Sequence, residues 1–248
     1  MTPMLALFTV SVRQALPRKR FLLLSLLQLA PAAIYLVSTT NRTEAFALKA
    51  AVEVGGPIFF LLILPVVAIV IATGVLGSER RDQTLSFVVL RPIPRSAIGA
   101  AKVFAAVCAA FALNAVGAVA LAGSHAIRFG DPQLFVGLLV GALIATSAYS
   151  AIFVPIGFLT DRAVIVGMAY LLIFENGIVA VLPGLSSMSP ARLGVAAFGA
   201  LTPDVAIYVT EFTGALDLSA PRSMLTAAIY LAVGVGATAI LLRTRDLA

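Results

Sequence analysis

Charged residues are scarce in this chain of 248 residues, because Asp, Glu, Lys and Arg make up only 11% of it. A typical soluble protein has about a quarter of its residues charged. Hydrophobic residues make up 61%, and the mean hydropathy is +1.07. So little polar surface cannot cover a water-soluble globule, and the composition therefore indicates a membrane protein.

Histidine and cysteine, which often act in catalysis and bind metals, are also scarce. There is one histidine, His125, and one cysteine, Cys108. The sequence has no G-x-x-x-x-G-K-[ST] phosphate loop and no H-E-x-x-H zinc pair, and its one histidine lies at the outer end of an apolar block, which leaves no plausible Ser-His-Asp triad. We therefore expect no enzyme activity and no cofactor bound by this chain. The neighbours of His125 provide no carboxylates, so no metal site is expected. Cys108 can form no intrachain disulfide.

What is abundant is apolar sequence in blocks of about 20 residues, the length of helix that crosses a ~30 Å hydrocarbon layer. We predict an all-α integral membrane protein with a single transmembrane domain, 1–248. Its six predicted spans are Phe21–Val37, Ile58–Leu76, Val103–Ala122, Leu134–Phe158, Ala163–Leu182 and Met224–Leu242.

The basic residues predict the orientation. Twelve of the 17 Lys and Arg residues fall on one side of these spans, and the other side is slightly acidic. By the positive-inside rule both termini are cytoplasmic, in the cytoplasmic membrane of a prokaryote. The net charge of +6 then reflects topology and contact with anionic lipid, and no nucleic-acid site is expected.

Two short elements flank the spans. In the cytoplasmic arm, 1–20, Leu5, Phe8, Val12 and Leu16 recur at helical spacing, which predicts an amphipathic helix on the membrane surface. Within the external loop 183–223, the apolar run Leu193–Leu201 is too short to span. Pro183–Pro203 is therefore interpreted as an external re-entrant or interfacial element, the alternative being a floppy outer loop with an apolar patch.

The loop 77–102 between the second and third spans is the densest charged patch of the chain. Ser78 is a plausible N-cap, Glu79 would lie in the first turn, and Pro92 would end a helix near Leu90. Such a helix can insert into a groove on a cytosolic partner. The alternative is an ordinary juxtamembrane helix whose arginines meet lipid phosphates.

The pattern of this loop resembles a known family. Glu79, Thr84-Leu85, Phe87–Leu90, Arg91-Pro92-Ile93-Pro94-Arg95 and Lys102 are similar to the "E…GTL…LL…P(I/V)(S)R…K" segment of type-2 ABC transporter permeases, mostly export systems. Gln83 and Ser86 depart from it, standing where glycine and an acidic residue are usual. A second similarity is Phe174-Glu175 followed by Val181-Leu182-Pro183-Gly184-Leu185, like the "(W/F)E…LPGL" signature of some members.

The resemblance implies a permease subunit that moves an unidentified substrate, driven by ATP and Mg²⁺ on a separate P-loop ATPase, with two ATPase copies and a second permease copy or paralogue. It implies that helix 78–90 is the coupling helix. The docking residues are then Glu79, Arg80, Asp82, Thr84, Leu85, Phe87, Val88, Leu90, Arg91, Pro92 and Arg95. Alternatives are a non-transporting membrane scaffold or assembly factor, and a passive channel or ion-driven transporter.

Two polar residues within the fifth predicted span suggest a second functional or structural position. Glu175 is ionisable, and its neighbour Asn176 could share a hydrogen bond across helices. An ionisable group in a span faces the protein interior or a water-filled path. Glu175 is therefore either a residue on the translocation path or a buried polar clasp between helices.

Small residues predict close helix packing. Gly137 and Gly141 form a G-x-x-x-G pair, and Gly234 and Gly236 lie among alanines. These faces could stabilise either the bundle or a dimer.

Overall fold

The computed structural model describes residues 3–83, 93–213 and 219–244, and within these ranges it contains helices and no strand. The α-helices are α1 (Pro3–Ala15), α2 (Arg18–Gln28), α3 (Ala30–Ser38), α4 (Glu44–Ala50), α5 (Leu64–Arg81), α7 (Arg95–Phe129), α8 (Leu134–Leu159), α9 (Ala163–Tyr170), α10 (Val179–Val181), α11 (Pro190–Leu201), α12 (Pro203–Thr213) and α13 (Ala220–Thr244). The π-helical segments are η1 (Ala51–Gly55), η2 (Ile58–Ile63) and η3 (Leu171–Ile178), and η4 (Pro183–Met188) is a 3-10 helix.

Five helical stretches of the described chain are long and apolar enough to cross a membrane. They are Arg18–Ser38, Glu44–Arg81, Arg95–Phe129, Leu134–Leu159 and Ala220–Thr244. Each coincides with one predicted span, so five of the six predictions are confirmed by length and composition. The second stretch is much longer than predicted, because α4, η1, η2 and α5 form one helical run.

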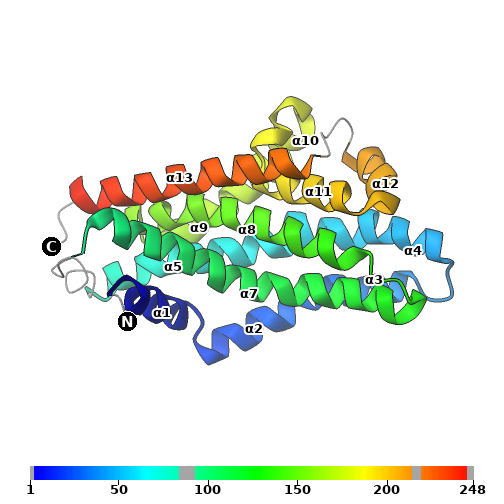
Figure 1. Ribbon diagram of the computed structural model, residues 1–248, viewed down its shortest axis with the longest axis horizontal. Helices are drawn as coiled ribbons and strands as arrows, with labels where there is room; N and C mark the ends of the chain where they lie inside the picture. The colour runs from blue at the N-terminus through cyan, green and yellow to red at the C-terminus, as the bar shows by residue number, and fades with distance from the viewer. Residues whose placement is uncertain (1–2, 84–92, 214–218, 245–248) are drawn as a thin grey trace.

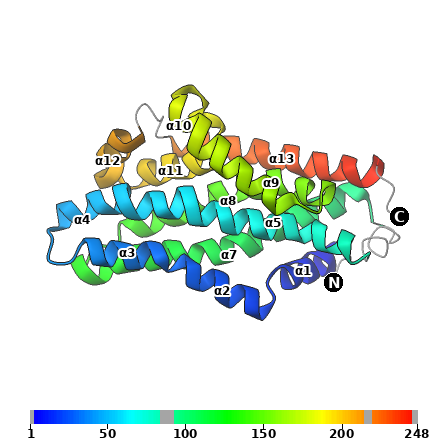
Figure 2. The ribbon, with the colours of Figure 1, turned by 180° about the vertical axis from the view of Figure 1, so that it is seen from behind.

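The remaining predicted span, Ala163–Leu182, is helical but is not among those five. Its α9 segment passes into η3 and α10, and Ala163–Ile178 counts as a shorter apolar helix. In Figures 1 and 2 the chain leaves the end of α8 along α9, and α13 later runs in the direction opposite to α9. The stretch between α8 and α13 is therefore divided among several short helices.

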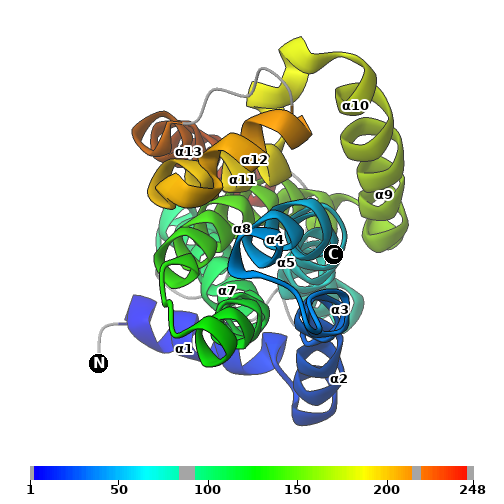
Figure 3. The ribbon, with the colours of Figure 1, turned by 90° about the vertical axis from the view of Figure 1, so that its right-hand side faces the viewer.

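Helix α8 lies at the centre of the bundle. It packs against α5, α7, α11 and α13, and the end-on view places it between them (Figure 3). In the apolar window of Leu134–Leu159, 67% of residues are buried, against 22% for Arg18–Ser38 and 28% for Ala220–Thr244. The two poorly buried stretches therefore present apolar side chains to lipid or to another protein.

Both chain ends lie at one end of the bundle, beside the end of α5 and the start of α7 (Figure 1). Helix α1 packs there against α7 and α5. The predicted helix in the arm exists, and the face that it packs against the bundle is not the stripe predicted to lie on the membrane surface. Leu7, Ser11 and Ala15 are buried, whereas Leu5 is exposed. The predicted stripe beginning at Leu5 is thus not the face that α1 packs against the bundle.

The region 183–203 is ordered into helices rather than a floppy loop. After η4, helix α11 begins at Pro190 with Ser189 as its N-cap, whose side chain accepts a hydrogen bond from the Arg192 backbone N–H. Most of α11 is buried, and it packs against α8 and α13.

Three of the four glycines predicted to allow close packing, Gly137, Gly141 and Gly234, do so within the chain. A Cβ at Gly141 would lie 2.5 Å from the carbonyl oxygen of Gly194 on α11, and one at Gly234 would lie 2.4 Å from the carbonyl oxygen of Ala151 on α8. A Cβ at Gly236 would meet nothing within 4 Å. Gly141 and Gly234 thus let two helices approach α8 closely.

Candidate functional site

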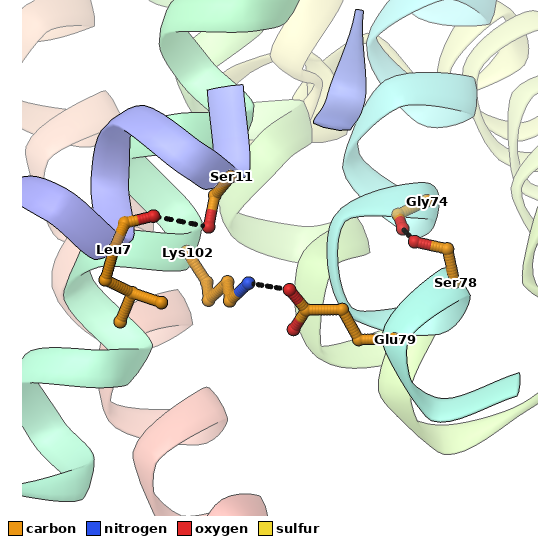
Figure 4. A network of polar contacts seen from close by, with 6 residues as sticks. All are labelled: Leu7, Ser11, Gly74, Ser78, Glu79 and Lys102. Carbon is orange, nitrogen blue, oxygen red and sulfur yellow. Dashed lines mark hydrogen bonds and ion pairs between the residues drawn. The ribbon is translucent and has the colours of Figure 1, made fainter. Parts of the chain in front are cut away.

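The loop predicted to dock a partner starts and ends at a buried ion pair. Lys102 Nζ on α7 donates a hydrogen bond to Glu79 Oε1 on α5, and the two residues are 0% and 7% exposed. Figure 4 shows this pair beside α1, whose Ser11 hydroxyl donates to the Leu7 carbonyl. The pair joins the end of α5 to the first turns of α7.

The position of Glu79 corrects the predicted start of the coupling helix. Ser78 is not an N-cap, because α5 continues to Arg81 and Asp82 is its C-cap. The Ser78 hydroxyl instead donates to the Gly74 carbonyl at 2.6 Å, inside the helix. Glu79 therefore lies in the last turns of α5, where the helix dipole disfavours a carboxylate and the ammonium group of Lys102 compensates for it.

Two predicted docking arginines bind the C-terminal ends of neighbouring helices. Arg80 donates to the Phe158 carbonyl near the end of α8 and forms an ion pair with Asp161 at 3.2 Å. Arg95 donates to the Leu242 carbonyl near the end of α13. Arginine at a helix C-terminus satisfies carbonyls that lack an intrahelical partner. Both side chains therefore tie the bundle together at this end.

The other predicted docking residues lie outside the described residues, except Asp82. These are Thr84, Leu85, Phe87, Val88, Leu90, Arg91 and Pro92. The last described residue before this gap, Gln83, has a φ of 54°. This left-handed conformation favours glycine, which gives a physical reason for the glycine usual at this place in the family that the sequence resembles.

Glu175 lies in η3 and joins three parts of the chain. Its Oε1 accepts hydrogen bonds from Tyr149 of α8 at 2.8 Å and from Tyr170 at 3.4 Å. Its Oε2 accepts one from Ser189, the N-cap of α11. Glu175 is only 3% exposed. Both carboxyl oxygens are thus satisfied by hydroxyl groups, an arrangement that can fix η3 against α8 and α11.

Asn176 does not share this network. Its side-chain amide donates to the Leu171 carbonyl at 2.9 Å, in its own helix, so the predicted hydrogen bond across helices is wrong. Arg192 on α11 interacts electrostatically with Glu175. Burial lowers the pKa of the Arg192 guanidinium below its ordinary value, and the carboxylate of Glu175 opposes that shift.

One buried polar chain was missed by the sequence interpretation. Gln28 Nε2 donates to Asn114 Oδ1, and Asn114 Nδ2 donates to Thr146 Oγ1 at 2.8 Å. All three residues are fully buried, and they connect α2, α7 and α8. Polar residues isolated in apolar spans are the signal that could have found them, the same signal that singled out Glu175.

The environment of His125 also differs from expectation. Glu44 and Asp131 each bring a carboxylate oxygen to within 4.8 Å of a ring nitrogen of His125 and of each other. The expectation that no carboxylate lies near this histidine is therefore wrong. Glu44, in α4, is 81 residues before His125 in the sequence. In space, its carboxylate lies beside the end of α7.

The fold thus defines a multi-pass helical membrane protein whose buried polar contacts tie the helices to one another. A protein-family model described as "ABC-2 family transporter protein" matches residues 15–185, more than half of the chain. The chain therefore belongs to the ABC-2 family of transporter proteins and is a membrane permease component of an ABC transport system. No curated protein matches its sequence.

Proposed function

We propose that this permease moves its substrate, in the export direction, across the cytoplasmic membrane of a prokaryote, driven by a separate P-loop ATPase that docks on residues 78–90. Two ATPase subunits and a second permease, either another copy or a paralogue, would complete the transporter. The family match to residues 15–185, which includes the whole loop between α5 and α7, carries this proposal.

The contacts at the ends of that loop support a route for mechanical coupling. Movement of the loop by the ATPase would reach α5 through Glu79 and α7 through Lys102, which are bonded to each other. Because Arg80 and Arg95 bind the ends of α8 and α13, the same movement would reach those helices also. Switching between inward-open and outward-open states would then involve several helices together.

The orientation of the chain in the membrane is part of the same proposal. With both termini cytoplasmic, the end of α5 and the start of α7 face the cytosol, where ATP and Mg²⁺ are available to the partner. Glu175 then acts as a clasp between η3, α8 and α11 rather than as a residue on the translocation path, in line with its three hydroxyl donors.

Affinity purification in mild detergent tests the docking step. We expect the wild-type chain to retain a P-loop ATPase, identified by mass spectrometry, and a Leu85→Asp, Phe87→Asp variant to lose it, because carboxylates placed on an apolar docking face disfavour binding. The matched control is Ile127→Asp, which adds a carboxylate at a residue that is 91% exposed on the last turn of α7.

The control variant should retain the ATPase. A folded wild-type chain that recovers no ATPase would contradict the proposal and favour a scaffold, channel or ion-driven transporter. Equal recovery with the loop variant would leave a transporter whose ATPase docks elsewhere.

A further inference from the structure

The end of the bundle opposite the chain termini holds a cluster of potential metal ligands that the transport proposal does not use. Glu44 begins α4, His125 lies in the last turns of α7, and Asp131 follows α7 in the connection to α8. Figure 3 looks onto this end, where α3, α4 and the end of α7 meet. One ligand atom from each of the three residues lies within 4.8 Å of the others.

Local structure places each of these side chains. Thr43 is the N-cap of α4 and sets Glu44 in its first turn. Gly130, with a φ of 77°, ends α7 and turns the chain so that Asp131 follows immediately. The Asp131 carboxylate accepts hydrogen bonds from the backbone N–H and side chain of Gln133, which fixes its position.

The ring of His125 is held in an orientation that leaves one nitrogen free. Its Nδ1 shares a hydrogen bond of 2.8 Å with the hydroxyl of Tyr35, a fully buried residue of α3. Its Nε2 is buried and has no hydrogen-bond partner among the described residues. A buried polar atom left without a partner is destabilising, and a metal ion bound at Nε2 would remove that cost.

The charges at this end are also suited to a cation. Among the described residues, neither Glu44 nor Asp131 forms an ion pair with a basic side chain. Arg128, the arginine nearest in sequence to His125 and Asp131, donates instead to Thr39 and to the Leu36 carbonyl on α3. Arg42, the arginine nearest in sequence to Glu44, lies over the ring of Phe46, 5.1 Å from its centroid. Two carboxylates beside a neutral imidazole would balance the charge of a divalent ion.

We propose that Glu44, His125 and Asp131 form a binding site for a divalent transition-metal ion, with Zn²⁺ as the best fit to one imidazole and two carboxylates. Three protein ligands leave a fourth tetrahedral position for water. Bond lengths of about 2.0–2.2 Å imply ligand atoms roughly 3.4 Å apart, so the side chains would close inward by small rotations. Tyr35 is the positioning residue that holds Nδ1.

A bound ion would join the start of α4 to the connection between α7 and α8. These segments belong to two different spanning helices and to the beginning of a third. The site would therefore restrain the relative positions of those helices at the end of the bundle away from the predicted docking loop.

Isothermal titration of the detergent-purified full chain with ZnCl₂, after removal of metal by a chelator, tests the site. We expect saturable binding of one Zn²⁺ per chain in the wild type. Glu44→Gln should weaken binding at least tenfold, and His125→Gln should abolish it. Tyr35→Phe should weaken it by about 10–100-fold, as is usual when a partner of a metal-bound histidine is removed.

The matched control is Glu53→Gln. Glu53 is exposed, lies in the same helical run as Glu44 and forms an ion pair with Lys49. Its Zn²⁺ affinity should equal that of the wild type. Because Glu44 is exposed, its variant should fold normally, which thermal unfolding without metal would verify. Replacing Zn²⁺ by Co²⁺ should give a visible absorption spectrum that Glu44→Gln alters.

Two results would overturn the proposal. One is a folded wild-type chain without saturable Zn²⁺ binding, in which case a water molecule satisfies Nε2. The other is binding that Glu44→Gln and His125→Gln leave unchanged, which would place the metal elsewhere.

Discussion

Glu79 and Lys102 are buried where an unpaired charge would be costly. Glu79→Gln would leave the fully buried ammonium group of Lys102 without its carboxylate. Breaking a buried pair from one side costs about 3–5 kcal/mol. We expect a loss of stability of that order, measured by denaturant unfolding in detergent, and partial recovery in a Glu79→Leu, Lys102→Met double variant, which removes both charges.

The exposed pair Lys49–Glu53, at 3.5 Å, supplies the comparison. Glu53→Gln should cost less than about 1 kcal/mol, as is usual for surface ion pairs. If Glu79→Gln costs no more than Glu53→Gln, the ion pair does not hold α5 to α7.

Glu175 accepts hydrogen bonds from hydroxyl groups that are themselves buried. Glu175→Leu would leave the buried hydroxyls of Tyr149 and Ser189 without their acceptor. Each such group costs about 1–3 kcal/mol. We expect a clear fall in unfolding temperature for Glu175→Leu and a smaller one for Glu175→Gln, whose amide keeps an acceptor and adds donors. Wild-type stability in both variants would contradict the clasp and favour a position on the translocation path.

At the scale of helices, close packing on α8 depends on single glycines. Alanine is favoured over glycine in a helix by about 0.8–1 kcal/mol, so Gly236→Ala on α13 should be neutral or slightly stabilising. Gly234→Ala, two residues earlier in the same helix, would place a methyl group 2.4 Å from a carbonyl oxygen of α8. We expect it to destabilise the chain by about 1–3 kcal/mol, measured as a fall in unfolding temperature.

The pair of variants shares one helix and one chemical change, so a difference between them reports the α13–α8 contact. Equal stabilities would mean that α13 does not pack against α8 at Gly234.

Five of the six spans were predictable because their length and hydropathy are local properties. The face that α1 packs against the bundle was not, since apolar residues occur on more than one side of the helix, and periodicity does not decide which side meets lipid and which meets protein. Leu7 and Ala15 pack inward, while Leu5 is exposed. Ser78 was wrongly predicted as an N-cap because a serine can also bond the carbonyl four residues earlier within a helix.

Contacts between distant segments were the least predictable part of the site. Glu79 and Lys102 both belong to the motif, but their pairing depends on how α5 and α7 pack. Glu44 and His125 come together because the turn after α3 brings the start of α4 beside the end of α7. Neither proximity follows from spacing along the chain.

For the whole molecule, the two ends of the bundle carry different features. One end has the termini, the buried ion pair and the arginines that bind the ends of α8 and α13. The other has the carboxylates beside His125. The proposal assigns the first end to the ATPase and to the cytosol, which separates the energy source from the proposed metal site by the length of the bundle.

Photocrosslinking in intact cells tests this assignment most directly. A photoreactive amino acid would be placed at Gln83, beside the proposed docking segment, or at Pro132, at the opposite end; both residues are exposed. We expect a crosslink from Gln83 to a P-loop ATPase and none from Pro132. An ATPase crosslink from Pro132, or none from either position in a normally inserted chain, would contradict it.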